Sequence, residues 1–126
     1  MEAKEKILSF WFEGVDKGTV LSKEGDYTKR WFYPDVSSDE LIKSRFEEDL
    51  QKASKGEYDS WKEESLGWLA LILLLDQFSR RIYRGSAEAL SFDLQALEYC
   101  LRALKRKTDE DLEFFQRIFL YMPLVH

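Results

Sequence analysis

The fold is decided by residues 66–75, which read Leu-Gly-Trp-Leu-Ala-Leu-Ile-Leu-Leu-Leu. An unbroken apolar run leaves no polar face, so it predicts a helix that is buried on every side. The run is about half as long as a membrane span requires. We therefore expect it to form the central helix of an all-α domain.

Helical periodicity is weaker on the N-terminal side of this segment. Ile7, Phe10 and Trp11 share one face of a short first helix. Residues 13–30, which contain three glycines and scattered charges, predict a long surface loop. Residues 31–34 read Trp-Phe-Tyr-Pro and are expected to pack as an aromatic plug across the first helix.

A second helix is expected to begin near Ser38, with Ser37 as its N-cap and Glu40 completing a capping box. Gly56 is a suitable residue to end it. Its expected buried positions are Ile42, Phe46, Leu50 and Ala53.

Two longer helices are predicted after the central one, preceded by a short helix over 86–90. Asp93 is expected to cap the first of them and Thr108 the second, which ends at Pro123. The expected buried positions are Leu94, Leu97, Leu101 and Leu104 in the first, and Leu112, Phe115, Phe119 and Met122 in the second. Across the domain, we expect Leu69, Leu73, Leu97, Leu101, Phe115 and Phe119 to be buried together.

The composition narrows the classes of function. The chain has 126 residues, one Cys and one His, which predicts a single domain over 1–126 and excludes a disulfide framework or a multi-His metal site. We expect no cofactor. The net charge of −5 disfavours binding to nucleic acid or to an anionic membrane surface. With no signal peptide and no membrane span, we expect a cytoplasmic protein.

The strongest candidate site comes directly after the buried run. Asp76 and Arg80, and likewise Gln77 and Arg81, are spaced to meet along a helix. Guanidinium groups are suited to binding phosphate or carboxylate. The candidate ligand-binding residues are Asp76, Gln77, Arg80, Arg81, Tyr83 and Arg84. The alternative is an Asp76–Arg80 ion pair beside two solvated arginines, because exposed ion pairs are common and contribute little.

Other reactive residues have simpler explanations. Cys100 lies on the apolar side of a helix and is typical of a core residue. A histidine at position 126, three residues beyond Pro123, is expected to be frayed and inert. No nucleotide-binding or hydrolase motif is present, so the catalytic residues, if any, are unknown.

Several segments resemble domain-of-unknown-function family 924. They are residues 7–12 (Ile-Leu-Ser-Phe-Trp-Phe), 31–32, 71–85 (Leu-Ile-Leu-Leu-Leu-Asp-Gln-Phe-Ser-Arg-Arg-Ile-Tyr-Arg-Gly) and 119–126. The resemblance implies an antiparallel, TPR-like array of about five main helices and no established reaction. Members of the family usually have Pro and Asn where this chain has Ser79 and Arg81, and an acidic residue where it has Val125.

The resemblance also implies further C-terminal helices, which this chain is expected to lack. In relatives, the equivalent of His126 is internal and near the arginine cluster, so His126 joins the candidate ligand-binding residues. The final helix carries apolar residues on more than one face, namely Phe114, Phe115, Ile118, Phe119, Tyr121 and Met122. We therefore expect self-association through this helix.

Three functions remain open from the sequence. The first is binding of a small anionic ligand by the arginine cluster. The second is a TPR-like module that binds other proteins. The third is an enzyme in which Asp76 or His126 acts as general base.

Overall fold

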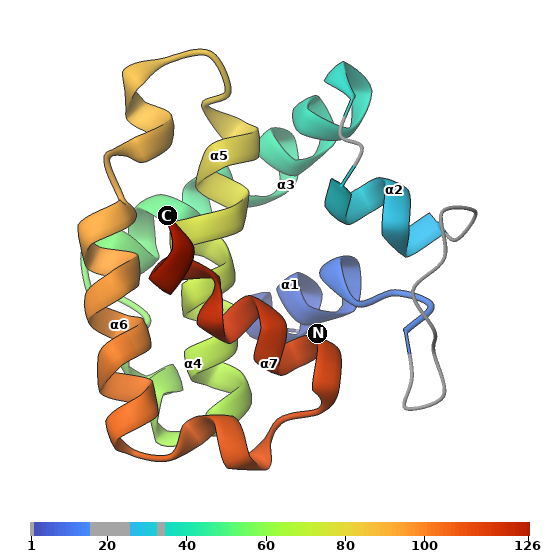
Figure 1. The fold of residues 1–126 in the computed structure, drawn as a ribbon. Helices are drawn as coiled ribbons and strands as arrows, with labels where there is room; N and C mark the ends of the chain where they lie inside the picture. Colours follow the sequence, from blue (N-terminus) through green and yellow to red (C-terminus); the bar gives the residue numbers. More distant parts are fainter. Residues whose placement is uncertain (1, 16–25, 33–34) are drawn as a thin grey trace.

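The computed structural model describes residues 2–15, 26–32 and 35–126, and every regular element in these ranges is helical (Figure 1). The all-α prediction is therefore confirmed. The helices are α1 (Ala3–Trp11), α2 (Asp26–Phe32), α3 (Val36–Ser54), α4 (Ser65–Ile72), α5 (Ser79–Ile82), α6 (Asp93–Lys105) and α7 (Phe114–Tyr121). Shorter turns join them, namely η1 (Asp59–Glu63), η2 (Leu73–Phe78), η3 (Ala87–Leu90), η4 (Thr108–Asp111) and η5 (Met122–Val125).

The predicted central helix is confirmed. α4, the π-helical turn η2 and α5 follow one another without a break through the middle of the molecule (Figure 1). Residues 67–76 are all buried, and Leu66 is the exception to the predicted run because 41% of it is exposed. α1, α6 and α7 pack against α4, while α3 packs against η2 and α5. A helix without a polar face is stable only when neighbours cover it on all sides.

Gly67 lets η1 lie directly against this helix. A Cβ atom at position 67 would stand 1.8 Å from the main-chain oxygen of Trp61, far inside contact distance. Only glycine therefore fits where η1 crosses α4.

The aromatic residues of the N-terminal part form the other half of the core. The Trp11 ring lies 5.4 Å from that of Phe119 and 5.5 Å from that of Phe78. Trp31 packs on Trp11, and its Nε1 donates to the Trp11 carbonyl oxygen at 2.9 Å. The predicted packing of Trp31 across the first helix is confirmed, while Tyr33 and Pro34 lie outside the described residues.

Two expectations for the N-terminal part are wrong. Residues 26–30 belong to α2 rather than to a surface loop, whereas 16–25 lie outside the described residues. Arg30 fixes α2 because its guanidinium donates to the carbonyl oxygens of Trp11 and Glu13, a tertiary contact that local propensity does not reveal. α3 begins at Val36, and its N-cap is Asp35, whose Oδ1 accepts from the Ser38 backbone N–H at 2.7 Å.

The rest of the prediction for α3 is confirmed. Its buried residues are Ile42, Phe46, Leu50 and Ala53. The helix ends at Ser54, and Gly56 follows with a φ of +83°, a conformation that favours glycine.

The leucine repeat of α6 does not face the core, which overturns the predicted stripe. Leu94 is 84% exposed and Leu101 52%, while Leu97 and Leu104 are half-buried. The buried face is instead Ala96, Tyr99, Cys100 and Ala103. Three of these side chains are small, so α6 can approach α4 more closely than a row of leucines would allow.

The final helix starts later than predicted. Thr108 opens the turn η4, and α7 begins at Phe114, where Glu113 and Gln116 form a capping box. Leu112, Phe115 and Phe119 are buried and Met122 is half-buried, as expected. Of the six residues predicted to be buried together, Leu69, Leu73, Phe115 and Phe119 are confirmed, whereas Leu97 and Leu101 are not.

Replacing Leu73 by Ala tests the central helix. Leu73 is fully buried, so removing its side chain should lower the free energy of unfolding by about 2–5 kcal/mol. Urea denaturation measures this loss. Val36→Ala is the matched control, because Val36 is 72% exposed and its loss should stay within about 0.5 kcal/mol. Equal losses in the two variants would contradict the placement of Leu73.

Candidate functional site

The central helix carries one buried acidic residue, Asp76. Asp76 is only 1% exposed and belongs to the π-helical turn η2. Gln77 Nε2 donates to its Oδ2 at 2.8 Å, whereas Oδ1 is buried without a hydrogen-bond partner. π-Helical turns occur frequently at functional sites, and a buried acceptor left unpaired is costly. Asp76 is therefore the centre of the candidate site.

Arg80 links this carboxylate to α6. Its Nη2 lies 3.9 Å from Asp76 Oδ1 and donates to both carboxylate oxygens of Asp93, at 2.9 and 3.0 Å. Arg80 Nε is buried and has no hydrogen-bond partner. Asp93, expected only as a helix cap, is thus a residue of the site that sequence reasoning missed.

The C-terminal turn brings His126 to the same place. Its Nε2 lies 3.3 Å from Asp76 Oδ2, and its side chain is 27% exposed. The structure thus gives His126 a defined partner, in place of the frayed and inert end expected from the sequence alone. We call Asp76, Gln77, Arg80, Asp93 and His126 the polar cluster.

Burial has the largest effect on the pKa of Asp76 in the polar cluster. Loss of hydration raises the pKa of Asp76 above the ordinary value of 3.8. The Gln77 hydrogen bond and the charges of His126 and Arg80 oppose this shift, while the nearby Asp93 charge adds to it. Burial prevails, so Asp76 keeps a proton to higher pH than an exposed aspartate does.

Arg81 and Arg84 do not join the polar cluster. Both guanidiniums pair with Asp39 on α3, Arg84 Nε at 2.6 Å from Oδ2. Arg81 is 5% exposed and also donates to the Ser38 hydroxyl at 2.6 Å and to the Arg30 carbonyl oxygen at 2.7 Å. This arrangement ties α5 to α3 and α2. The expected contact between Gln77 and Arg81 is absent, because each side chain has these other partners.

Tyr83 has partners other than the arginines. Its hydroxyl accepts a hydrogen bond from Gln51 Nε2 at 2.8 Å, and its ring stacks on Phe92. It borders a shallow surface groove with Glu40, Lys43, Glu47 and Glu48, among others. The excess of carboxylates there makes this groove unsuited to an anion.

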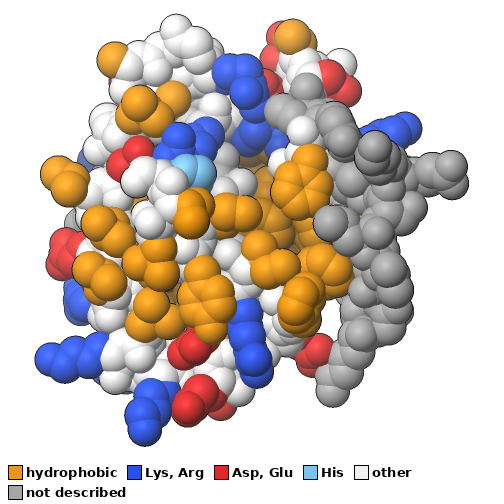
Figure 2. Space-filling view, in the orientation of Figure 1, with side chains coloured by type: hydrophobic (Ala, Val, Ile, Leu, Met, Phe, Trp, Pro, Cys, Tyr) orange, Lys and Arg blue, Asp and Glu red, His pale blue; other side chains and the backbone are white. Residues whose placement is uncertain are grey.

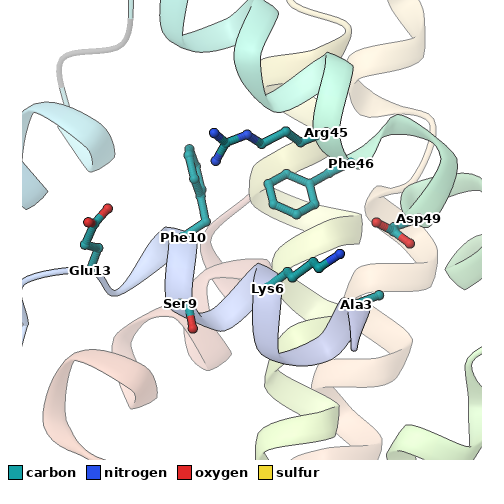
Figure 3. A pocket seen from close by; sticks show the side chains of 8 residues that line it. All are labelled: Ala3, Lys6, Ser9, Phe10, Glu13, Arg45, Phe46 and Asp49. Carbon is teal, nitrogen blue, oxygen red and sulfur yellow. The ribbon is translucent and has the colours of Figure 1, made fainter. Parts of the chain in front are cut away.

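A second hollow lies between α1 and α3 and contains none of the candidate ligand-binding residues (Figure 3). Its volume is about 650 Å³, and its walls include Lys6, Phe10, Arg45 and Phe46. The Arg45 guanidinium lies 5.9 Å from the centre of the Phe10 ring. These side chains come from two helices that are far apart in the sequence, and the periodicity of one helix does not reveal such a contact.

The described residues contain neither a metal-binding cluster nor a membrane-spanning helix. Within residues 2–15, 26–32 and 35–126, no group of three or more His, Cys, Asp or Glu could hold a metal ion. Among the described helices, none combines the length and the apolarity needed to cross a membrane.

The fold and the polar cluster define an all-helical protein with a buried carboxylate at a helix irregularity. The chain belongs to the family described as "Bacterial protein of unknown function (DUF924)", which it matches over residues 7–126. It is also similar to a solved protein of unknown function, ATU0120 from Agrobacterium tumefaciens, at 32% identity and a TM-score of 0.81. That likeness covers 98% of this chain, which spans 63% of its neighbour's length. No curated protein matches the chain.

The pH dependence of stability tests the burial of Asp76. Because its pKa is raised in the folded state, the folded protein holds a proton that the unfolded chain releases. Rising pH above about 3.8 therefore destabilises the wild type relative to Asp76→Asn, until the folded carboxyl has also ionised. Urea denaturation of both proteins between about pH 3.5 and 8 measures the difference in their free energies of unfolding. If the wild type became more stable relative to Asp76→Asn as the pH rises, the raised pKa of Asp76 would be contradicted.

Proposed function

We propose that the polar cluster binds a small anionic ligand. One observation carries the proposal: a buried acceptor, Asp76 Oδ1, and a buried donor, Arg80 Nε, lie in the same cluster and both lack a hydrogen-bond partner among the described residues. Buried polar groups in folded proteins are almost always paired, if not by protein then by water or a ligand. A partner that both donates and accepts satisfies them together.

The hydrogen-bond donors of the polar cluster suit an oxyacid, such as a carboxylic acid or a phosphate monoester. Arg80 supplies a guanidinium, and His126 lies at the accessible side of Asp76. The raised pKa of Asp76 makes its carboxyl group easier to protonate, which lessens its repulsion of an anion. Gln77 orients this carboxyl group through its hydrogen bond.

Catalysis is a second candidate for the same residues. An imidazole beside a buried carboxylate, here 3.3 Å apart, is a common arrangement for general acid–base chemistry. In this version Asp76 orients His126 and Arg80 holds the anionic part of a substrate. Arg81, Tyr83 and Arg84, which were candidates from the sequence, have structural roles in either version.

We also propose self-association through the C-terminal segment. The apolar residues exposed there are Phe114 (71%), Leu124 (49%) and Val125 (74%), whereas Phe115, Phe119 and Leu120 are buried. Figure 2 shows hydrophobic side chains gathered over α6, α7 and the C-terminal turn. Exposed apolar surface of this kind marks an interaction site. Recognition of other proteins is the alternative use of this surface. We also propose that the protein is cytoplasmic.

Two arginine variants test ligand binding. We expect Arg80→Ala to weaken binding of an anion at least about tenfold, because a charge-assisted hydrogen bond contributes about 1.5–3 kcal/mol. Arg84→Ala is the matched control, since Arg84 pairs with Asp39 outside the polar cluster. Inorganic phosphate, acetate and a panel of phosphorylated and carboxylated metabolites are the probes, detected by thermal shift and titration calorimetry.

Folding of these variants is checked by circular dichroism, because Arg80→Ala leaves two carboxylates without their guanidinium. Arg80→Lys keeps the charge but loses the forked contact with Asp93, so it separates charge from geometry. Binding that is unchanged in Arg80→Ala, or lost equally in Arg84→Ala, would overturn the anion site.

Light scattering tests self-association. At micromolar concentration we expect a molar mass above the 15.0 kDa of one chain. The double variant Phe114→Ser, Val125→Ser should lower it, because both side chains are exposed and contribute to an interface and not to the core. A monomeric wild type that also fails to bind a hydrophobic dye would refute the proposal.

A further inference from the structure

The leucines of α6 have the spacing of a helix–helix seam. Leu94, Leu97, Leu101 and Leu104 are separated by three, four and three residues, the alternation that places side chains along one edge of a coiled coil. In the structure Leu94 and Leu101 are exposed, whereas Leu97 and Leu104 are half-buried and Leu104 also packs against the core. We call these four residues the leucine seam.

The leucine seam is not needed to hold α6 on its own domain. A separate face of the helix, formed by Ala96, Tyr99, Cys100 and Ala103, is already buried, and α6 packs against α4. A surface helix normally has one apolar face and one polar face. α6 has two apolar faces, and only one of them is covered within the described part of the chain.

Large apolar side chains outside the seam are also exposed, namely Leu90, Phe114, Leu124 and Val125. Figure 2 shows hydrophobic side chains gathered over α6 and α7. With Leu94 and Leu101, six large apolar residues are each about half exposed or more. A standard interface buries roughly 800 Å² on each partner.

The charges beside the leucine seam favour a second copy in the opposite direction. Asp93, whose side chain is 30% exposed beside Arg80, is the first residue of α6, and Lys105 is the last. Two α6 helices packed antiparallel bring Asp93 of each copy toward Lys105 of the other. Their helix dipoles also oppose each other favourably.

We infer that two copies of this chain pair through their leucine seams, with the two α6 helices antiparallel around a twofold axis. This inference rests on the proposed self-association and specifies the surface and the orientation. Leu94 then faces Leu104 of the other copy, and Leu97 faces Leu101. The exposed residues of η5 lie at the border of this interface and extend it.

Seam variants test the location of the interface. Leu94→Glu and Leu101→Glu place charges in the seam and should raise the dimer dissociation constant at least tenfold in light scattering and analytical ultracentrifugation. Both positions are at least half exposed, so the fold should persist by circular dichroism. Val36→Glu is the matched control, because Val36 is 72% exposed on α3, outside the seam.

Single-cysteine crosslinking tests the orientation and does not depend on the seam variants. In the antiparallel pair, Glu98 lies near the twofold axis, so Glu98→Cys should form a disulfide between copies under mild oxidation. The two copies of Leu94→Cys are about 15 Å apart along the axis, from the 1.5 Å rise per residue, and should not. Cys100 does not interfere, because it is buried and its pKa is raised to about 11.

The outcomes separate the two proposals. Loss of the dimer in the seam variants but not in Val36→Glu supports the leucine seam. A dimer that resists both seam variants but is lost in Phe114→Ser, Val125→Ser overturns the seam and leaves self-association through the C-terminal segment. A monomeric wild type overturns both, and crosslinking by Leu94→Cys instead of Glu98→Cys overturns the antiparallel orientation.

Discussion

The complete burial of the helix formed by α4, η2 and α5 is the constraint on which the rest of the structure depends. Because this helix has no polar face, α1, α3, α6 and α7 must cover it from all sides. It also carries Asp76 into the interior, where water cannot solvate the carboxylate. The polar cluster is therefore a consequence of the core, since Gln77, Arg80 and His126 surround a carboxyl group that the central helix has buried.

The three arginines that follow the central helix illustrate how one short segment can serve two purposes. Arg80 faces α6 and meets Asp93, whereas Arg81 and Arg84 face α3 and meet Asp39. The two carboxylates hold the end of the central helix from opposite sides. Only the Arg80 side also leaves buried polar atoms without partners, which is why the ligand proposal concerns that side alone.

Sequence reasoning succeeded where the signal lies within one segment. The run over 66–75 identifies the central helix, and the abrupt change to polar residues locates Asp76, Gln77 and Arg80. It failed where the answer depends on distant partners. Asp39 is more than forty positions from Arg81, and no periodicity links them. The leucines of α6 satisfied the pattern of a buried stripe, but small residues on another face allowed closer packing against α4.

The rate at which Cys100 reacts with a thiol reagent can report local opening of this fold. The only cysteine of the chain is fully buried and lies on the face of α6 that is turned inward. An alkylating reagent can reach its sulfur only when α6 separates from α4, and reaction also requires the thiolate form. The rate of labelling therefore reports how often this pair of helices opens under native conditions, at a single known atom and without any substitution.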